Sequence, residues 1–175
     1  MNNLICPNQN TNFLSPNSFQ FKIDCLPNLS YFCTSVGMPN VSLPVLSSAT
    51  PLSYIKEPSS KLEFESLNIG FIVDSECENW LELYNWMRGL GFPESNQEFT
   101  NYTNSGHALN RGVTSQTHSN ASLLILGSNR LPAKTINFKN CIPTFISGFS
   151  LSTSNTDVQY VAATATFEFE YFTIE

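Results

Sequence analysis

The sequence predicts a mainly β protein with one α-helix. Apolar and polar residues alternate along several segments, which is the period of half-buried strands. One segment alone, 75–88, has the apolar spacing and the end residues of a helix. The chain has 175 residues, of which 41% are hydrophobic, so it is long enough for one domain with its own core. We expect that domain to span 17–175, after an Asn-rich N-terminal arm at 1–16 that has too few apolar residues to pack.

The first half of the domain is expected to be a meander of strands. Pro44 lacks a backbone N–H, so the strand that contains it is expected at a sheet edge or a bend. The inward-facing apolar residues change from even-numbered to odd-numbered positions around Glu65 and Ser66, and we expect a β-bulge there. The strands expected in this half are 17–25, 30–36, 41–46 and 61–74, with a turn at 26–28.

The helix at 75–88 carries more apolar surface than one sheet can cover. Ser75 and Glu78 form a capping box at its start, and Gly89 and Gly91 mark its end. One apolar stripe is widened on one side by three further residues, which makes them candidates for contact with another subunit. The alternative is that the same chain covers Trp86 itself. The three subunit-interface candidates are Leu83, Trp86 and Leu90.

The second half of the domain begins with a long polar loop at 94–120, rich in Asn, Ser and Thr. Strands are expected after it, and the last one spans 158–174. About 16 residues at ~3.4 Å each exceed 50 Å, far more than an ordinary strand of ~5–6 residues. This strand is therefore expected to bend between two sheets or to reach beyond its own subunit. The strands expected in this half are 121–126, 135–139, 145–151 and 158–174.

Composition and motifs argue against an enzyme. Charged residues make up 13% of the chain and its net charge is −6, so no basic surface is expected to grip phosphates. His107 and His118 lie in the polar loop without acidic or Cys neighbours at ligand spacing, so we expect no metal, no cofactor and no catalytic residues. The five cysteines have no C-x-x-C spacing and are expected to be reduced thiols. No signal peptide or membrane span is expected.

Several strings of the sequence occur in the order found in a known family. They lie at 17–23, 36–39, 67–74, 80–87, 138–144 and 164–171. In their order along the chain they resemble the tail tube proteins of contractile-tailed bacteriophages. The resemblance implies two packed antiparallel sheets, as in a β-sandwich or split barrel, with one helix. It also implies hexameric rings that join into an inner β-barrel and stack into a tube through which DNA passes. The implied partners are further copies of the chain and the sheath, baseplate or neck proteins of a virion tail assembled in the host cytoplasm.

Three roles stay open for such a chain. The first is the repeating tube subunit, the second is a specialised end ring (a baseplate initiator or a tail terminator), and the more distant third is a monomeric carbohydrate-binding β-sandwich. If the chain forms a ring, acidic residues near the lumen would let DNA pass without binding. The lumen-facing candidates are Glu63, Glu65, Glu168 and Glu170.

Overall fold

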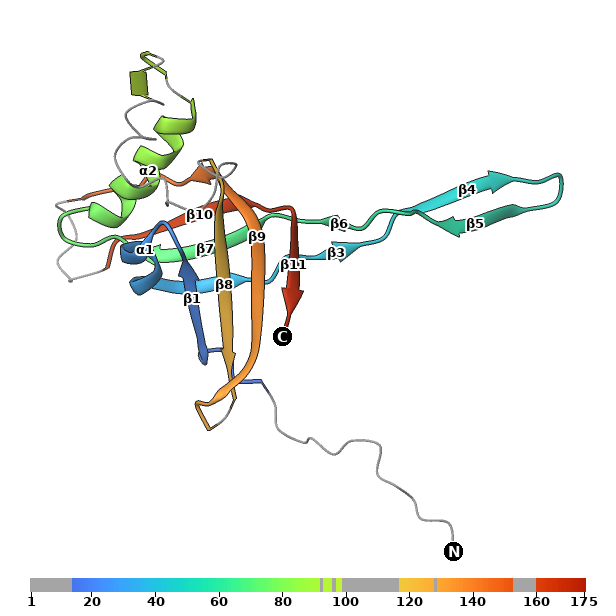
Figure 1. The fold of residues 1–175 in the computed structure, drawn as a ribbon, viewed down its shortest axis with the longest axis horizontal. Coiled ribbons are helices and arrows are strands. Elements are labelled where there is room, and N and C mark those ends of the chain that lie inside the picture. The colour runs from blue at the N-terminus through green and yellow to red at the C-terminus, as the bar shows by residue number, and fades with distance from the viewer. Residues whose placement is uncertain (1–13, 92, 96, 99–116, 128, 153–159) are drawn as a thin grey trace, which may run out of the picture.

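The computed structural model describes residues 14–91, 93–95, 97–98, 117–127, 129–152 and 160–175 (Figure 1). It confirms a mainly β fold with antiparallel sheets and one main helix. In chain order the elements are β1 (Phe19–Ile23), α1 (Pro27–Tyr31), β2 (Cys33–Gly37), β3 (Val41–Ser42), β4 (Val45–Ala49), β5 (Tyr54–Pro58), β6 (Glu63–Phe64), β7 (Leu67–Ile72), α2 (Glu78–Gly91), β8 (Ser119–Leu126), β9 (Pro132–Ile146), β10 (Ala162–Glu168) and β11 (Tyr171–Ile174).

Two antiparallel sheets share the 15-residue strand β9. From Pro132 to Cys141, β9 pairs with β8, and on its other side it pairs with β11. From Ile142 to Ile146 it pairs with β10 instead. We call the set β1–β8–β9–β11 sheet A and the set β9–β10–β7–β2 sheet B. In Figure 1 the long strands of sheet A run across the direction of those in sheet B.

The change of sheet takes place at one corner. Asn140 has a positive φ of 56°, which bends β9. Its side-chain Nδ2 donates to Glu170 Oε2 at 2.6 Å, and the N–H of Glu170 donates to the carbonyl of Lys139 at 3.0 Å. Glu170 lies in the crossover between β10, in sheet B, and β11, in sheet A. The expectation that the last long segment bends between two sheets is therefore confirmed.

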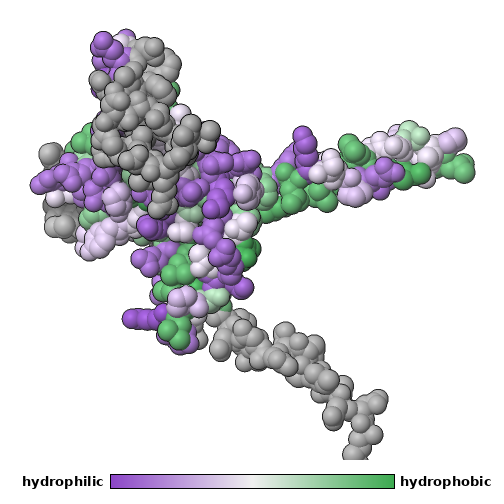
Figure 2. Space-filling view, viewed as in Figure 1, coloured by the Kyte–Doolittle hydropathy of each residue, from purple (hydrophilic) through white to green (hydrophobic). Residues whose placement is uncertain are grey.

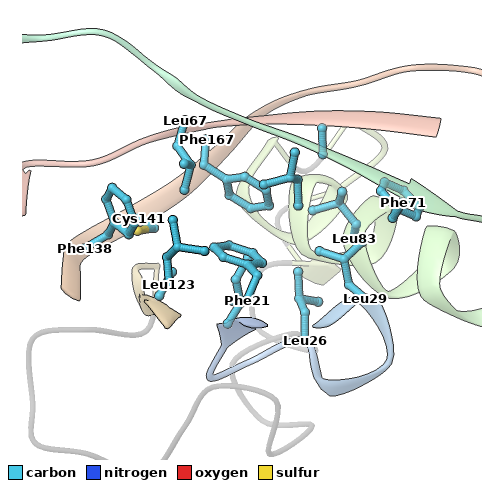
Figure 3. Close-up of a cluster of buried hydrophobic side chains, with 14 of the residues drawn as sticks. Phe21, Leu26, Leu29, Leu67, Phe71, Leu83, Leu123, Phe138, Cys141 and Phe167 are labelled. Carbon is cyan, nitrogen blue, oxygen red and sulfur yellow. The ribbon is translucent and has the colours of Figure 1, made fainter. Parts of the chain in front are cut away.

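The core lies between the two sheets and is closed at one end by the helices. In Figure 3, Phe21 and Leu123 of sheet A face Leu67 and Phe167 of sheet B. Leu29 of α1 and Leu83 of α2 complete the cluster beside Phe71. Leu67, Phe71, Phe138 and Phe167 are completely buried. The alternation that predicted the strands is thus the alternation of core and outer residues.

The main helix begins and ends later than predicted. The start predicted at Ser75 is wrong, because the carboxylate of Asp74 caps the helix: Asp74 Oδ1 accepts the N–H of Glu78 at 2.8 Å. Asn79 is fully buried and donates to the carbonyl of Ile72 at 2.7 Å, which ties the first turn to β7. Gly89 does not stop the helix, since it lies buried on the packed face. A glycine costs a helix interior only about 1 kcal/mol, and packing offsets that.

Two local predictions in the first half are wrong. The expected turn and strand start at 26–32 form the short helix α1, whose first turn contains Pro27 and whose Leu29 is fully buried. The phase change at 65–66 is no bulge. It is the break between β6, which pairs with β3, and β7, which pairs with β10 and β2.

Two other expected strands belong to one strand in the structure, and one hairpin was not expected. The expected strands at 135–139 and 145–151 belong to β9 up to Ile146, and the residues after it are not strand. The β4–β5 hairpin was not predicted, although Thr50 and Pro51 mark its turn. Most of the expected polar loop at 94–120 and of the N-terminal arm lies outside the described residues.

The cap of α2 gives a direct test of how this helix begins. Replacing Asp74 with Ala leaves the N–H of Glu78 without its acceptor and should lower the free energy of unfolding by about 1 kcal/mol. Asp74→Asn is the matched control, because Asn caps helices about as well as Asp. Urea denaturation measures both changes. Equal stability of the Ala and Asn variants would contradict the assigned cap.

Candidate functional site

One face of sheet B is turned away from the core and is built mainly from uncharged residues, many of them small. Register places Thr166 beside Asn68 and Thr164 beside Gly70, and on the other side of Gly70 it places Ser35. All of these side chains are at least partly exposed. We call this surface the polar face. Its described members are Thr34, Ser35, Gly37, Asn68, Gly70, Ile72, Ile142, Phe145, Ala162, Thr164, Thr166 and Glu168.

Hydrogen bonds within the polar face hold its side chains down. Thr166 Oγ1 donates to Asn68 Oδ1 at 2.8 Å across β10 and β7. Thr34 Oγ1 donates to the carbonyl of Gly70 at 3.1 Å. A Cβ on Gly70 would come within 2.4 Å of Ser35 Oγ, so glycine leaves room for that hydroxyl. These two hydrogen bonds link β10 to β7 and β2 to β7 across the face.

The four predicted lumen-facing carboxylates do not lie together. Only Glu168 is on the polar face, at the end of β10, and it is the one charged residue among the described members of that face. Glu170 is at the corner, held by Asn140. Glu63 is on β6, and Glu65 follows it and accepts from Asn40 Nδ2 at 2.8 Å.

Both edges of sheet B are open in the part of the chain that the structure describes. At one edge, β2 pairs only with β7, and at the other edge residues 142–146 of β9 pair only with β10. Phe145 stands at the β9 edge with 54% of its surface exposed, the one large aromatic on the polar face. Open edges offer unpaired N–H and C=O groups, and proteins normally pair or cover them.

The predicted subunit-interface residues face the chain's own core instead. Leu83 and Trp86 are 0% and 2% exposed, and the Trp86 ring lies 6.2 Å from that of Phe167 in β10. Leu90 is partly buried against the same cluster. Sheet B thus covers the helix face proposed for a neighbour, which corrects that prediction.

The exposed apolar stripe of α2 lies on the other side of the helix. Leu81 and Tyr84 are 45% and 40% exposed. The ring of Tyr84 stacks on Trp80 at 5.4 Å, and Trp80 Nε1 donates to the carbonyl of Ser147 at 3.1 Å. The helical period shows how wide the apolar arc is, but it does not show which part of the arc meets the sheet.

Alanine substitutions separate the two sides of this helix. Trp86→Ala should lower the free energy of unfolding by about 3–5 kcal/mol, because it empties a buried aromatic site. Tyr84→Ala is the control on the exposed side and should lower it by less than ~1.5 kcal/mol, the contribution of one ring pair. Chemical denaturation of both variants measures the difference. Equal losses would contradict this orientation of α2.

The described residues hold no cluster of metal-ligating side chains. Among them, no group of three or more His, Cys, Asp or Glu residues could hold a metal ion. His118 Nδ1 is 2.7 Å from Thr117 Oγ1, and His107 lies outside the described residues. In the same described part of the chain, no helix is both long and apolar enough to span a membrane.

The described cysteines are free thiols in poorly solvated positions. Burial raises the pKa of Cys25 and of Cys33 to about 11, and that of Cys141 to about 12. Such thiols stay protonated near neutral pH and are therefore poor nucleophiles and poor metal ligands. They serve as small core residues.

These raised pKa values predict a loss of stability in alkaline solution. Unfolded thiols ionise near pH 9, whereas folded ones resist ionisation until about pH 11. Their contribution is complete below pH 9 and is lost as the pH rises through that window. With a reducing agent present, the urea midpoint should fall between pH 8 and pH 10. The fall should be smaller in a Cys25→Ala/Cys141→Ala variant, and an equal fall would contradict the assignment.

Comparison with known proteins shows which of them have a similar sequence or fold. No family model matches the chain. A tail tube terminator protein of Enterobacteria phage T4 is 34% identical over 58 residues, which cover 31% of this chain and 33% of that protein. The match thus spans about a third of the length of that relative.

Two solved structures match nearly the whole chain. The tube-terminating cap of the anti-feeding prophage has a TM-score of 0.61 and 10% identity, and the match covers 99% of this chain and 98% of that one. The sheath/tube terminator of an extracellular contractile injection system, PVC, in its extended state has a TM-score of 0.58 and 12% identity, covering 95% and 99%. The chain therefore has a fold found in contractile injection systems, which confirms the resemblance to contractile-tail tube proteins.

Proposed function

We propose that this chain is a structural subunit of a ring that closes the end of a contractile tail tube. The main observation behind this proposal is the match to a tube-terminating cap over nearly the full length of both chains. The partial match to a phage tail tube terminator supports the same role. Among the roles predicted from sequence, the specialised end ring is thus better supported than the repeating tube subunit. A carbohydrate-binding sandwich is not supported by these similarities and is withdrawn.

The open edges of sheet B explain how such a ring would close. Sheet B has four strands in antiparallel order, so β2 and β9 at its two edges run in opposite directions. A rotated copy therefore brings β9 of one subunit antiparallel to β2 of the next, and the ladder continues without interruption. Six copies, the number implied by the family resemblance, would form one closed barrel that has no free edge.

The polar face would then line the channel. It carries uncharged residues and one carboxylate, Glu168, per subunit; the uncharged ones are Thr, Ser, Asn and Gly together with the apolar Ile72, Ile142, Phe145 and Ala162. Phosphates bind proteins through Lys and Arg, so a wall of this kind lets DNA pass without holding it. Glu168, one of the four lumen-facing candidates predicted from the sequence, would face the channel. Glu63, Glu65 and Glu170, at the arm root and the corner, would lie near the channel mouths.

The partners follow from the position of an end ring. Copies of the chain meet within the ring, one flat side of the ring meets the last tube ring, and sheath or neck proteins meet the outside. The location is the tail of the virion, after assembly in the host cytoplasm. The role is structural rather than catalytic.

Electron microscopy and light scattering of the purified protein test this proposal. We expect isolated rings with a central channel, and addition of purified tail tubes should place such rings at tube ends only. Stacking of the protein alone into long tubes would instead favour the repeating subunit. A monomer at micromolar concentration that also fails to bind tube ends would contradict both roles.

A variant at the β9 edge tests how the ring closes. Phe145→Lys places a charge on the channel side of the seam, beside the outward residues of the next subunit's β2, and should shift the equilibrium from rings towards folded monomers. Leu81→Lys is the control, because Leu81 is similarly exposed but belongs to α2 and not to a strand of sheet B. Light scattering gives the oligomer mass and circular dichroism checks the fold. If the Phe145→Lys variant forms rings of unchanged stability, edge pairing is contradicted.

A further inference from the structure

A long hairpin leaves the body and is covered by nothing in the described chain. Figure 1 shows it as a narrow arm that projects beyond β7 and β2. We call residues 41–64 the arm. Strands β3 and β6 pair at its root, and strands β4 and β5 pair beyond them. Every residue of β4 and β5 is exposed.

Each face of the arm carries exposed large apolar residues beside one charged residue, Lys56 on one face and Glu57 on the other. Register places Ala49 opposite Tyr54 on one face and Ser48 opposite Ile55 on the other. Val45 shares the face of Tyr54, while Leu46 shares that of Ile55, and all four large apolar residues are at least 50% exposed. Figure 2 shows hydrophobic residues along the arm, interspersed with polar ones. A two-stranded ribbon is marginally stable in water by itself, so we expect a partner to pack against the arm.

The root of the arm is fixed to the body. Phe64 of β6 packs against Phe169 and Phe172, with ring centroids 5.8 and 5.4 Å apart. Both of these rings contact the fully buried Phe138, at 5.2 and 5.7 Å. Because the root is held by the core, the arm leaves the body in a set direction, as the continuation of β2 and β7 at the open edge of sheet B.

The length of the arm reaches a neighbouring subunit in the proposed ring. Strands of a closed barrel tilt by about 35–45°, and the 12 residues from Val41 to the tip at Leu52 span about 40 Å. The sideways reach is then about 25 Å, whereas four strands at ~4.8 Å are about 19 Å wide. Whichever way the strands tilt, the arm reaches an adjacent copy.

Edge pairing alone offers too little contact to hold two subunits together. Strand β2 contributes 5 residues, whereas a stable interface takes roughly 20–30 residues on each side. The arm begins four residues after β2 and supplies the missing area at the same edge. Resting on the function proposed above, we propose that the arm binds an adjacent copy of this chain in the same ring, which covers both of its faces.

Shortening the arm tests the proposal with the rest of the chain intact. The N–H of Ser59 donates to the carbonyl of Pro44 at 2.8 Å, so an Asn-Gly turn can join these two residues in place of 45–58. The shortened chain should keep its circular dichroism and unfolding midpoint. Its ring dissociation constant should rise at least about 100-fold, as expected when most of an interface is removed.

Point variants test the two faces separately. Leu46→Asp and Tyr54→Asp lie on opposite faces, and each should raise the ring dissociation constant at least about tenfold. Leu131→Asp is the control, since Leu131 is as exposed as Leu46 (61% and 60%) but lies in the turn between β8 and β9. Light scattering over a dilution series measures all three.

The outcomes separate this inference from the proposed function. If the unaltered chain forms no ring, the proposed function fails. If the unaltered and shortened chains form equally stable rings, the arm inference is wrong while the ring stands. It is also wrong if the shortened ring is equally stable but no longer binds tube ends, because the arm then contacts the tube. If only one of the Leu46→Asp and Tyr54→Asp variants weakens the ring, the claim that the adjacent copy covers both faces of the arm is contradicted.

Discussion

The structure depends on the bend in β9 at Asn140. A single strand serves both sheets because Asn140 takes a left-handed conformation there and its side chain binds Glu170 in the facing crossover. Asn is one of the few residues that tolerates this conformation. The bend directs residues 142–146 away from β8 and into sheet B. Without it, the two sheets could not enclose the core that buries Phe138 and Phe167.

The assembly features follow from that bend. Once β9 has left β8, its last residues pair on one side only within the described part of the chain, which leaves sheet B with an open edge there and another at β2. The alternation that buries Ala163, Ala165 and Phe167 turns the Thr residues of β10 outward onto the polar face. The arm extends the β2 edge. Two complementary edges and an uncovered arm on one subunit fit a ring in which each copy completes its neighbour.

The sequence was sufficient for some elements and insufficient for others. Period-two alternation located β1, β7, β8 and β10, because each has one face in the core and one outside. The length of the last segment, far beyond that of an ordinary strand, indicated that it bends between two sheets or reaches beyond its own subunit. The sequence pattern failed on α2, where both sides of the helix are apolar and only packing against sheet B decides that Trp86 is inside and Tyr84 outside. The polar face was missed, except for Glu168, since its residues come from four strands and join only through register.

The central claim is that β2 and β9 close the ring by pairing between copies. A high-resolution cryo-electron microscopy reconstruction of the assembled ring tests it most directly. We expect continuous antiparallel hydrogen bonding between β2 of one subunit and residues 142–146 of the next, with Thr164, Thr166 and Glu168 facing the channel. A ring whose subunits meet through other surfaces, with β2 open to solvent and the polar face on the outside, would contradict the account.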